Sequence, residues 1–366
     1  MEPDHTTASP ADFRRRLLGW YRRRKRDLPW RRTSDPYAIW ISEIMLQQTT
    51  VGAVIPHYKR WLKTFPGVGA LAAAPLRKVL KAWEGLGYYA RARNLHAAAK
   101  VFVKRYGRRI PDHYETLRSI PGFGPYTAAA VLSLAFGKPV PVLEANVRRV
   151  MMRLLGLHGR ADGRHDKAIS ARLEALIARR SPGDFNQAMM ELGALVCRAR
   201  SPLCAACPIH AFCAAFAAGE QEIIPHPKKV SYRKIEAVVA IIEDGRRILI
   251  QKRPETGLLA GLWEFPGGKM RPGESRRQAL VREVREETGA EISAPRFFLT
   301  VDHSYTKFQV KLHAFRCGLK TAPEKRGGAR LRWVRLRDLG AYPSPSGSAK
   351  IIRRLENEAG ISGARP

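Results

Sequence analysis

Residues 119–150 read SIPGFGPYTAAAVLSLAFGKPVPVLEANVRRV, a stretch that joins a glycine-rich turn to two helix starts. Gly122 and Gly124 lie in the turn, and Pro125 opens a run of strong helix formers. The sequence therefore predicts a hairpin leading into a helix N-terminus. Unpaired amides and the helix dipole attract a phosphate at such a turn, and glycine lets the phosphate approach closely. The alternative is an ordinary connection between two helices.

The second helix start follows at Glu144. The residues three, seven and ten positions after it are Val147, Met151 and Leu154, all of them apolar. We therefore expect the carboxylate of Glu144 to share an apolar face and to point inward. A carboxylate in that place is either paired with a cation or used in chemistry.

The chain is strongly basic. Its 65 Lys and Arg residues against 32 Asp and Glu residues give a formal net charge of +33, spread along the sequence. A preference for arginine explains the choice of Arg over Lys but not the excess of positive charge. We therefore expect a polyanionic partner, with nucleic acid ahead of a membrane surface. A length of 366 residues favours two domains.

Nothing in the sequence predicts a membrane protein. No apolar run approaches the ~18 residues needed to span a bilayer. Residues 1–10 lack the apolar region of a signal peptide. We therefore expect a cytoplasmic protein with no membrane partner.

The first 220 residues carry only helical patterns, and no strand signal of any strength precedes residue 230. We therefore expect the first half to be all-α. The expected helices cover residues 10–26, 37–48, 56–65, 75–83, 90–106, 126–136, 165–180 and 184–196.

A carboxylate interrupts the apolar face of the helix expected over 37–48. Ile39, Glu43 and Leu46 fall at positions i, i+4 and i+7, which places Glu43 between apolar neighbours. Burial raises the pKa of a carboxyl group and suits it to donate a proton near neutral pH. The alternative is a buried Glu43 paired with Arg31 or Arg32.

A short loop carries bulky side chains. Leu86, Tyr88 and Tyr89 surround Gly87 between two expected helices. In a basic protein, apolar and aromatic side chains on such a loop can wedge between bases. The alternative is that they pack the loop down onto the protein.

Four of the five cysteines are close together in the sequence. Their spacing is C-x6-C-x2-C-x5-C, with ligand candidates Cys197, Cys204, Cys207 and Cys213. In a reducing compartment this grouping indicates a metal centre rather than disulfides. Four cysteine ligands suit both zinc and an iron–sulfur cluster, so the spacing leaves the metal open.

The composition changes after the cysteines. Residues 221–233 are rich in Pro, Lys and charged side chains, which is typical of a linker. Strand-like apolar runs follow at 235–242, 247–251, 297–301, 308–317 and 331–334.

An acidic helix face lies among these strands. On the helix expected from about residue 275, Glu283, Glu286 and Glu287 fall at i, i+3 and i+4. In so basic a chain, such a face predicts a divalent-cation site. The alternative is a solvated acidic face neutralised by Arg282 and Arg285.

Four ordered segments and the cysteine spacing resemble one known family. The segments are LPWRRTSDPYAIWISEIMLQQT (28–49), LGYYARARNL (86–95), FNQAMMELGALVC (185–197) and LLAGLWEFPGG (258–268). The first half resembles the helix-hairpin-helix DNA glycosylases, and within them the adenine-specific mismatch DNA glycosylases, the MutY family. The second half resembles the Nudix-like domain found at the C-terminus of that family.

The resemblance implies a multidomain protein. An all-α helix-hairpin-helix glycosylase domain would cover residues 1–220, including an iron–sulfur cluster loop at 197–213. A linker would cover 221–233, and an α+β Nudix-like domain that recognises 8-oxoguanine would cover 234–366. A 4Fe-4S cluster would be held by the four cysteines.

The resemblance also implies a function. The protein would be a base-excision repair glycosylase that removes adenine mispaired with 8-oxoguanine or guanine in double-stranded DNA. It would be a monomer, cytoplasmic and associated with the nucleoid through DNA. The target adenine must leave the stack to be reached, and breaking its N-glycosidic bond calls for a proton on the leaving base and a stabilised sugar cation.

Matching motif positions implies the roles of single residues. Glu43 would protonate the adenine ring and later activate water, and Glu144 would stabilise the sugar cation. Tyr126 and Asn146 would orient that carboxylate, and Tyr126 occupies the position where relatives with lyase activity carry a catalytic lysine, so strand cleavage is not expected. The adenine pocket would be lined by Trp30, Arg31, Leu46 and Gln187. Contacts to DNA or 8-oxoguanine would come from Gln48, Thr49, Leu86, Tyr88, Gly122, Gly124, Tyr305, Thr306 and Lys307.

Two departures from the family pattern stand out. The family has Leu-Asp-Gly-Asn where this chain has Leu143, Glu144, Ala145 and Asn146. Glu carries its charge one methylene further out, and a displacement of ~1 Å can cost on the order of 10²-fold in rate. We expect activity to be retained, and the alternative is a lesion-binding protein with weakened catalysis. The family's Phe-Ser-His loop is replaced by the residues at 305–307.

The Nudix motif is otherwise complete, with only its last apolar position weakened at Ala290. This favours an additional activity, the Mg2+-dependent hydrolysis of oxidised nucleoside triphosphates. Glu283, Glu286 and Glu287 would hold that ion.

Overall fold

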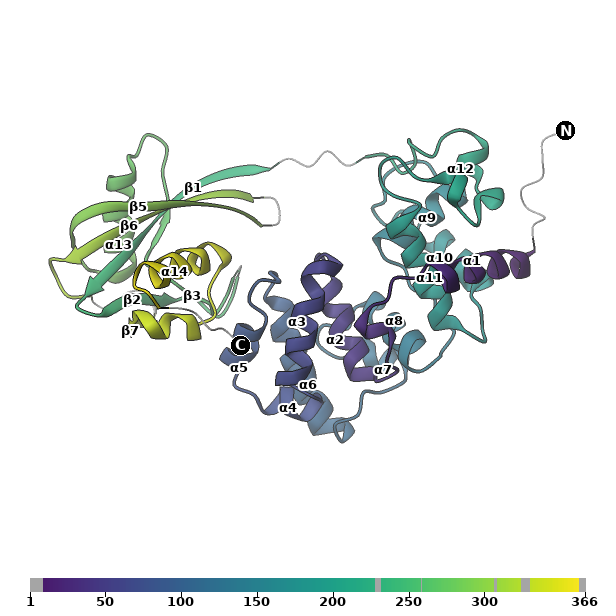
Figure 1. Cartoon of the computed structure of the whole chain (residues 1–366), viewed down its shortest axis with the longest axis horizontal. Coiled ribbons are helices and arrows are strands. Elements are labelled where there is room, and N and C mark those ends of the chain that lie inside the picture. The colour runs from purple at the N-terminus through teal and green to yellow at the C-terminus, as the bar shows by residue number, and fades with distance from the viewer. Residues whose placement is uncertain (1–8, 228–231, 258, 306–307, 324–329, 362–366) are drawn as a thin grey trace. The chain divides into compact units, whose positions relative to one another are not determined.

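The computed structural model describes residues 9–227, 232–257, 259–305, 308–323 and 330–361. Its contacts divide the chain into two compact units (Figure 1). Unit 1 comprises Met1–Ala72 and Ala97–Lys229, and unit 2 comprises Ala73–His96 and Val230–Pro366. Among the described helices, none is long and apolar enough to cross a membrane.

The prediction of an all-α first half is confirmed, because the described residues from 9 to 227 contain helices and no strand. The α-helices are α1 (Pro10–Arg24), α2 (Pro36–Leu46), α3 (Val51–Thr64), α4 (Val68–Ala73), α5 (Leu76–Ala82), α6 (Ala90–Tyr106), α7 (Tyr114–Arg118), α8 (Pro125–Ala135), α9 (Ala145–Leu154), α10 (Asp166–Leu176), α11 (Pro182–Leu195) and α12 (Ala214–Ala217). Three short 3-10 helices, η1 (Pro29–Arg31), η2 (Cys204–Ala206) and η3 (His210–Phe212), lie in the connections.

The largest difference from the expected helix bounds concerns α3, which begins at Val51 instead of residue 56. Pro56 therefore lies inside the helix, where it removes one backbone hydrogen bond. Val54, Tyr58 and Trp61 bury one face of α3 completely or nearly so. This tertiary packing extends the helix across a residue that local propensity treats as a start.

The glycine-rich hairpin forms as predicted. It connects α7 to α8, and Gly124 is the N-cap of α8 with Pro125 as the first helical residue. Gly122 is exposed and has φ 81°, a conformation that favours glycine. A Cβ placed on Gly124 would meet nothing within 4 Å. The backbone of the turn is therefore open to an approaching group, as a phosphate site requires.

Unit 2 contains a mixed sheet of seven strands in the order β3-β2-β1-β6-β5, with β4 paired to β1 and β7 paired to β2. The strands are β1 (Arg233–Asp244), β2 (Arg247–Lys252), β3 (Trp263–Glu264), β4 (Gly267–Lys269), β5 (Ile292–Tyr305), β6 (Phe308–Leu319) and β7 (Arg330–Arg335). β1 and β6 are parallel, and the other pairs are antiparallel. Two helices, α13 (Arg276–Thr288) and α14 (Ser346–Glu358), and the 3-10 helix η4 (Leu336–Ala341) complete the unit.

The alternating side chains of β1 supply two cores. Val239 and Ile241 pack in one cluster with Ile351 of α14, whereas Val238 and Ala240 pack in another that includes Leu280 and Val284 of α13. This period of two is what buries both faces of the sheet, each under its own helix.

Residues 73–96 pack with the sheet unit, a grouping that the sequence pattern does not predict. The hydroxyl of Tyr89 donates to the carbonyl of Ser344 at 3.0 Å. The amide of Ser344 in turn donates to Glu84 Oε2 at 3.2 Å. The segment that follows α5 is therefore hydrogen-bonded to the loop around Ser344.

Candidate active site

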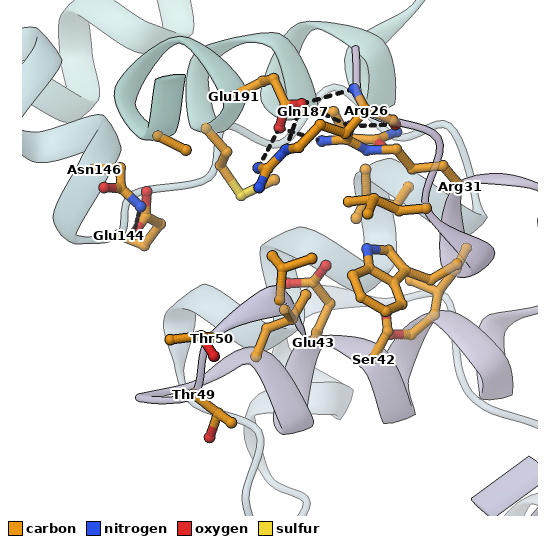
Figure 2. Close-up of a pocket in the computed structure, with 18 of the residues that line it drawn as sticks. Arg26, Arg31, Ser42, Glu43, Thr49, Thr50, Glu144, Asn146, Gln187 and Glu191 are labelled. Atoms are coloured by element: carbon orange, nitrogen blue, oxygen red, sulfur yellow. Dashed lines mark hydrogen bonds and ion pairs between the residues drawn. The ribbon is translucent and has the colours of Figure 1, made fainter. Parts of the chain in front are cut away.

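A pocket of 310 Å3 in unit 1 is lined by residues of η1, α2, α8, α9 and α11 (Figure 2). Glu43 points into it from α2, and Glu144 and Asn146 lie on the opposite side at the start of α9. The pocket brings together all eight residues predicted for catalysis and adenine binding: Glu43, Glu144, Tyr126, Asn146, Trp30, Arg31, Leu46 and Gln187. Thr49, predicted as a DNA contact, lines it as well.

Glu43 is held in the wall of the pocket by a well-capped helix. Asp35 caps α2 by accepting from the amides of Tyr37 at 3.0 Å and Ala38 at 3.3 Å. Two turns further on, Glu43 is only 4% exposed and accepts a short hydrogen bond from the hydroxyl of Tyr126. Burial raises the pKa of Glu43 to about 7, and the charge of Glu144 adds to the rise, whereas the Tyr126 bond opposes it.

The environment of Glu43 rules out the alternative of a structural ion pair with Arg31 or Arg32. Arg32 pairs with Asp27, and Arg31 pairs with Glu191. Glu43 is therefore a buried carboxyl with a pKa near neutrality and an open pocket in front of it, which is the condition for a general acid.

Glu144 has a different environment. It is the N-cap of α9, and its carboxylate accepts from the amide of Val147 at 2.9 Å and from Asn146 Nδ2 at 3.3 Å. Amide donors and the positive end of the helix dipole both favour negative charge there. The carboxylate thus faces the pocket from a capping position, and not from the apolar face of the helix on which the sequence pattern placed it.

Glu191 and Arg26 also line the pocket, and the sequence does not predict either of them. Glu191 is 1% exposed and binds both Arg26 and Arg31, with the Arg26 Nη2 and Arg31 Nη2 atoms at 2.7 and 2.9 Å from its Oε2. Burial alone would raise the pKa of Glu191, but the hydrogen bonds from the two arginines outweigh burial and hold the pKa at about 2. Glu191 follows Gln187 by one helical turn, which is the only sequence signal for it.

This network positions the side chains predicted to hold adenine. Arg31 also lies over the ring of Tyr21, 5.5 Å from its centroid. The hydroxyl of Tyr21 donates to Gln187 Oε1 at 3.1 Å, which leaves the amide nitrogen of Gln187 free to meet an acceptor. The ring of Trp30 packs edge-on against the ring of Tyr58, with 5.5 Å between the ring centroids. The pocket therefore offers an aromatic wall and fixed polar groups, as a planar base requires.

The cysteine loop is tied to the same helices. Arg153, buried on α9, donates to Cys197 Sγ at 3.3 Å and to the carbonyl of Arg198 at 2.6 Å. Arg149 donates to the carbonyl of Cys197 at 2.9 Å and to Asn146 Oδ1 at 2.9 Å. One arginine therefore joins the loop to the pocket residue Asn146.

The four cysteines of this loop are partly buried and form no disulfide. Burial raises the pKa of Cys207 to about 12, and the charges of Cys197, Cys213 and Cys204 contribute to the rise. In the part of the chain that the structure describes, no three His, Cys, Asp or Glu side chains are arranged to hold a metal ion. The metal centre therefore stays a prediction.

Comparison with known proteins identifies the family. The profile of the HhH-GPD superfamily of base excision DNA repair proteins matches residues 41–179, and the NUDIX domain profile matches residues 237–354. The chain is 32% identical over 422 residues to the adenine DNA glycosylase of Mus musculus, covering 98% of this chain and 81% of that protein. The chain belongs to the adenine DNA glycosylase family.

A second relative and a solved structure are also similar to the chain. It is 37% identical over 339 residues to the adenine DNA glycosylase of Homo sapiens, a match that covers 76% of this chain and 61% of the human protein's length. The structure of a thermostable thymine-DNA glycosylase matches with a TM-score of 0.53 and 31% identity, covering 57% of this chain and 97% of that one. The predicted family and the helix-hairpin-helix and Nudix-like folds are confirmed.

The residues predicted to contact DNA in this family member differ in exposure. Tyr88 is 43% exposed and Leu86 is buried, so of this pair only Tyr88 is accessible from outside the protein. Gln48 follows the end of α2 with φ 58°, which turns the chain sharply. Tyr305 ends β5, whereas Thr306 and Lys307 lie outside the described residues. These contacts stay predictions.

The acidic face of α13 is largely neutralised by one arginine. Arg282 donates to Glu283 at 2.8 Å, to Glu286 at 3.0 Å and to Glu274 at 2.7 Å. Glu287 accepts instead from the amide of Gly267 at 2.9 Å. The pairing favours the alternative of an acidic face countered by arginine, and the divalent-cation site stays a prediction.

Close packing of α11 on α9 fixes the position of Asn146. A Cβ on Gly193 would lie 2.7 Å from Asn146 Cβ and 3.2 Å from its carbonyl carbon and oxygen. We expect Gly193→Ala to displace Asn146, to lower the adenine release rate by on the order of tenfold and to cost about 1–3 kcal/mol of stability. Single-turnover kinetics and thermal unfolding measure both.

Gly52→Ala is the matched control for that substitution. Gly52 also lies inside a helix, but its added Cβ would meet nothing within 4 Å. This variant should keep the rate and gain up to ~1 kcal/mol. Equal behaviour of the two variants would contradict the role of close packing at Gly193.

Proposed function

We propose that this chain removes adenine mispaired with 8-oxoguanine or guanine in double-stranded DNA, by hydrolysing the N-glycosidic bond of a flipped-out adenine. One observation carries the proposal. Two carboxyls with opposite environments, buried Glu43 and helix-capping Glu144, face the same pocket of 310 Å3. Such a pair divides the work of an acid and an anion, as cleavage of a glycosidic bond requires.

In the proposed mechanism the protonated carboxyl of Glu43 donates its proton to the adenine ring as the bond to the sugar breaks. Glu144 stabilises the oxocarbenium-like sugar with its negative charge, and Asn146 holds that carboxylate by its 3.3 Å hydrogen bond. Glu43, now ionised and still bonded to Tyr126, accepts a proton from the water that attacks the sugar. Arg31 and Gln187 hold the base in place.

We also propose that the enzyme is monofunctional and does not cleave the strand. Cleavage through a lyase step needs an amine that attacks the sugar carbon. No lysine is among the described residues that line the pocket, and Tyr126 occupies the position predicted for it.

We also propose that the four cysteines hold the predicted 4Fe-4S cluster. They are four soft ligands close together in the sequence, and the guanidinium of Arg153 donates to the sulfur of Cys197, which suits a cluster with negative charge. When bound, the cluster would cross-link the loop over 197–213. Arg153 and Arg149 would then anchor that loop to α9. Iron and acid-labile sulfide analysis of the purified chain tests this, with four of each expected.

The pKa of Glu43 gives a pH profile for adenine release. Because the proposed acid must be protonated, the single-turnover rate should be constant well below pH 7 and fall about tenfold per pH unit well above it. A rate that rises through pH 7 to 8 would contradict the assignment of Glu43 as the acid.

Substrate preference tests the proposed function. Duplexes with adenine opposite 8-oxoguanine, guanine or thymine are incubated with the full chain and then heated in alkali. We expect scission at the adenine only opposite 8-oxoguanine and guanine, and no scission before alkali. Strand breaks without alkali would contradict the monofunctional mechanism, and equal scission opposite thymine would contradict mismatch recognition.

We also propose a second activity, at the two glutamates that lie beside strand β4. A Cβ on Gly268 would lie 2.3 Å from Glu283 Oε2, and Glu287 bonds the amide of Gly267. This close approach supports the predicted hydrolysis of oxidised nucleoside triphosphates with Mg2+. Incubation of the full chain with Mg2+ and 8-oxo-dGTP should release pyrophosphate, and absence of release would remove this candidate.

A further inference from the structure

Unit 2 contains a second hollow, distinct from the acidic face of α13. It has a volume of 640 Å3 and is formed by α5 together with strands β2, β3 and β7. This volume lies in the range of small-molecule sites. The residues that give the hollow its chemistry are Arg77, Lys252, Arg330, Arg332, Trp263 and Tyr342.

The hollow concentrates positive charge. Four cationic side chains face it against one carboxylate, Glu255, which gives a net charge of +3 from these five groups. Lys252 pairs with Glu255. In the described part of the chain, the three arginines have no acidic partner within salt-bridge distance, whereas Arg253, Arg282 and Arg316 of the same unit each pair with a glutamate.

The register of the sheet places like charges opposite each other, which lowers the stability of the fold. Lys252 on β2 stands directly opposite Arg330 on β7, and like charges in opposite positions destabilise a strand pair. Arg332 follows two residues later, so it projects from the same face as Arg330. The positive charges of Lys252 and Arg330 repel each other, and a bound anion would relieve that repulsion. Their juxtaposition therefore indicates an anionic ligand.

Aromatic rings lie next to these charges. Trp263 pairs with Lys252 across β2 and β3, and its ring meets the ring of Tyr342 edge-on at 5.2 Å. The guanidinium of Arg332 lies 5.7 Å from the centre of Trp263 and 5.9 Å from that of Tyr342, to whose hydroxyl it donates at 3.1 Å. The guanidinium of Arg77 lies 5.4 Å from the centre of Tyr342.

Guanidinium groups fixed on aromatic rings have two uses at once. Their planes can stack against a nucleobase, and their edges keep N–H donors for phosphate oxygens. The flanking cations Lys252 and Arg330 add charge without planar surface. A ligand that satisfies all of these groups carries both a planar base and phosphate.

We propose that this hollow is a nucleotide-binding site, separate from the adenine pocket around Glu43 and from the acidic face of α13. Its occupant is a nucleotide, held by base stacking on Arg332 and Arg77 and by phosphate contacts to Lys252 and Arg330. The bound group is either a nucleotide free in solution or one nucleotide residue of a DNA strand. The site does not depend on metal.

Calorimetric titration of the full chain with dGDP in the presence of EDTA tests the site, because chelation removes any metal-dependent binding elsewhere. We expect one dGDP per chain, bound at least about tenfold more weakly by Arg332→Gln and by Arg77→Glu. Arg77 is exposed, so its variant does not disturb the core. The matched control is Arg353→Gln, an exposed arginine of α14 outside the hollow, which should bind dGDP as the wild type does.

A second titration with a short single-stranded oligonucleotide separates the two sources. If a DNA strand is the occupant, the oligonucleotide binds more weakly to Arg77→Glu than to the control, because a stacking partner of the base is lost. Binding of either probe that these variants weaken supports the site. Pyrophosphate binding as tightly as dGDP, or no effect of either variant on both probes, would overturn it. Adenine release from mismatched DNA, measured on the same samples, reports separately on the Glu43 pocket.

Discussion

Glu43→Gln should slow adenine release by several orders of magnitude. Glutamine preserves the size of the side chain and can still accept the hydrogen bond from Tyr126, but it cannot donate a proton to the base or take one from water. Loss of a general acid and base costs about 10²–10⁴-fold, and one residue serves both steps here. Single-turnover release of adenine from an 8-oxoguanine:adenine duplex measures the loss.

The same substitution should stabilise the fold at alkaline pH. Burial raises the pKa of Glu43 to about 7 from 4.5, so the folded state binds a proton that the unfolded state loses between these values. The stability of the wild type therefore falls as pH rises through this window, by up to about 3 kcal/mol from this group. Chemical unfolding at pH 5 and pH 8 should show the stability gain of Glu43→Gln growing with pH.

This combination separates catalysis from folding. A variant that is inactive and also more stable at pH 8 has lost chemistry and not structure. Glu174→Gln, an exposed carboxylate of α10, is the control and should keep both the rate and the pH dependence of the wild type. Full activity of Glu43→Gln would contradict the assignment.

Glu144→Gln should lower the rate of adenine release by about 10²–10³-fold, the loss typical of a single electrostatic contact to a transition state. The neutral amide still caps α9 by accepting from Val147, so the helix start is preserved while the charge facing the sugar is removed. The affinity of this variant for DNA should stay within a few-fold of the wild type. The lost carboxylate acts on the sugar cation, which forms only as the N-glycosidic bond breaks.

Glu144→Asp addresses the departure from the family pattern directly. Asp is an equally good N-cap, so we expect its carboxylate to accept from Val147 and to keep the rate within about tenfold of the wild type. If Glu144→Gln loses nothing, the carboxylate at this position is not used. If Glu144→Asp raises the rate by 10²-fold or more, the natural Glu144 has weakened catalysis, as the lesion-binding alternative holds.

The sequence predicts the catalytic side of the pocket well, because helical periodicity is a local property. Glu43 between Ile39 and Leu46, and Glu144 at a helix start, both follow from spacing within a few residues. The hairpin and the all-α half follow from Gly and Pro placement in the same way. The roles of single residues come from the family resemblance, and spacing alone left the use of Glu144 open.

The features of the structure that the sequence does not predict depend on contacts between segments distant in the chain. Glu191 is paired with Arg26, 165 residues away in sequence, and no local pattern reports such a pair. The packing of residues 73–96 with the sheet unit is likewise a matter of tertiary contact. The hollow around Arg332 depends on strand register, which places Lys252 opposite Arg330 only once β2 and β7 are paired.

Direct detection of free adenine tests the central claim. The full chain is mixed in excess with a duplex containing one 8-oxoguanine:adenine pair, and the released base is quantified by chromatography alongside the Glu43→Gln and Glu144→Gln variants. We expect one adenine per duplex from the wild type, an intact strand until alkali is added, and far slower release from both variants. Tight binding of the duplex by the wild type with no free adenine would contradict it.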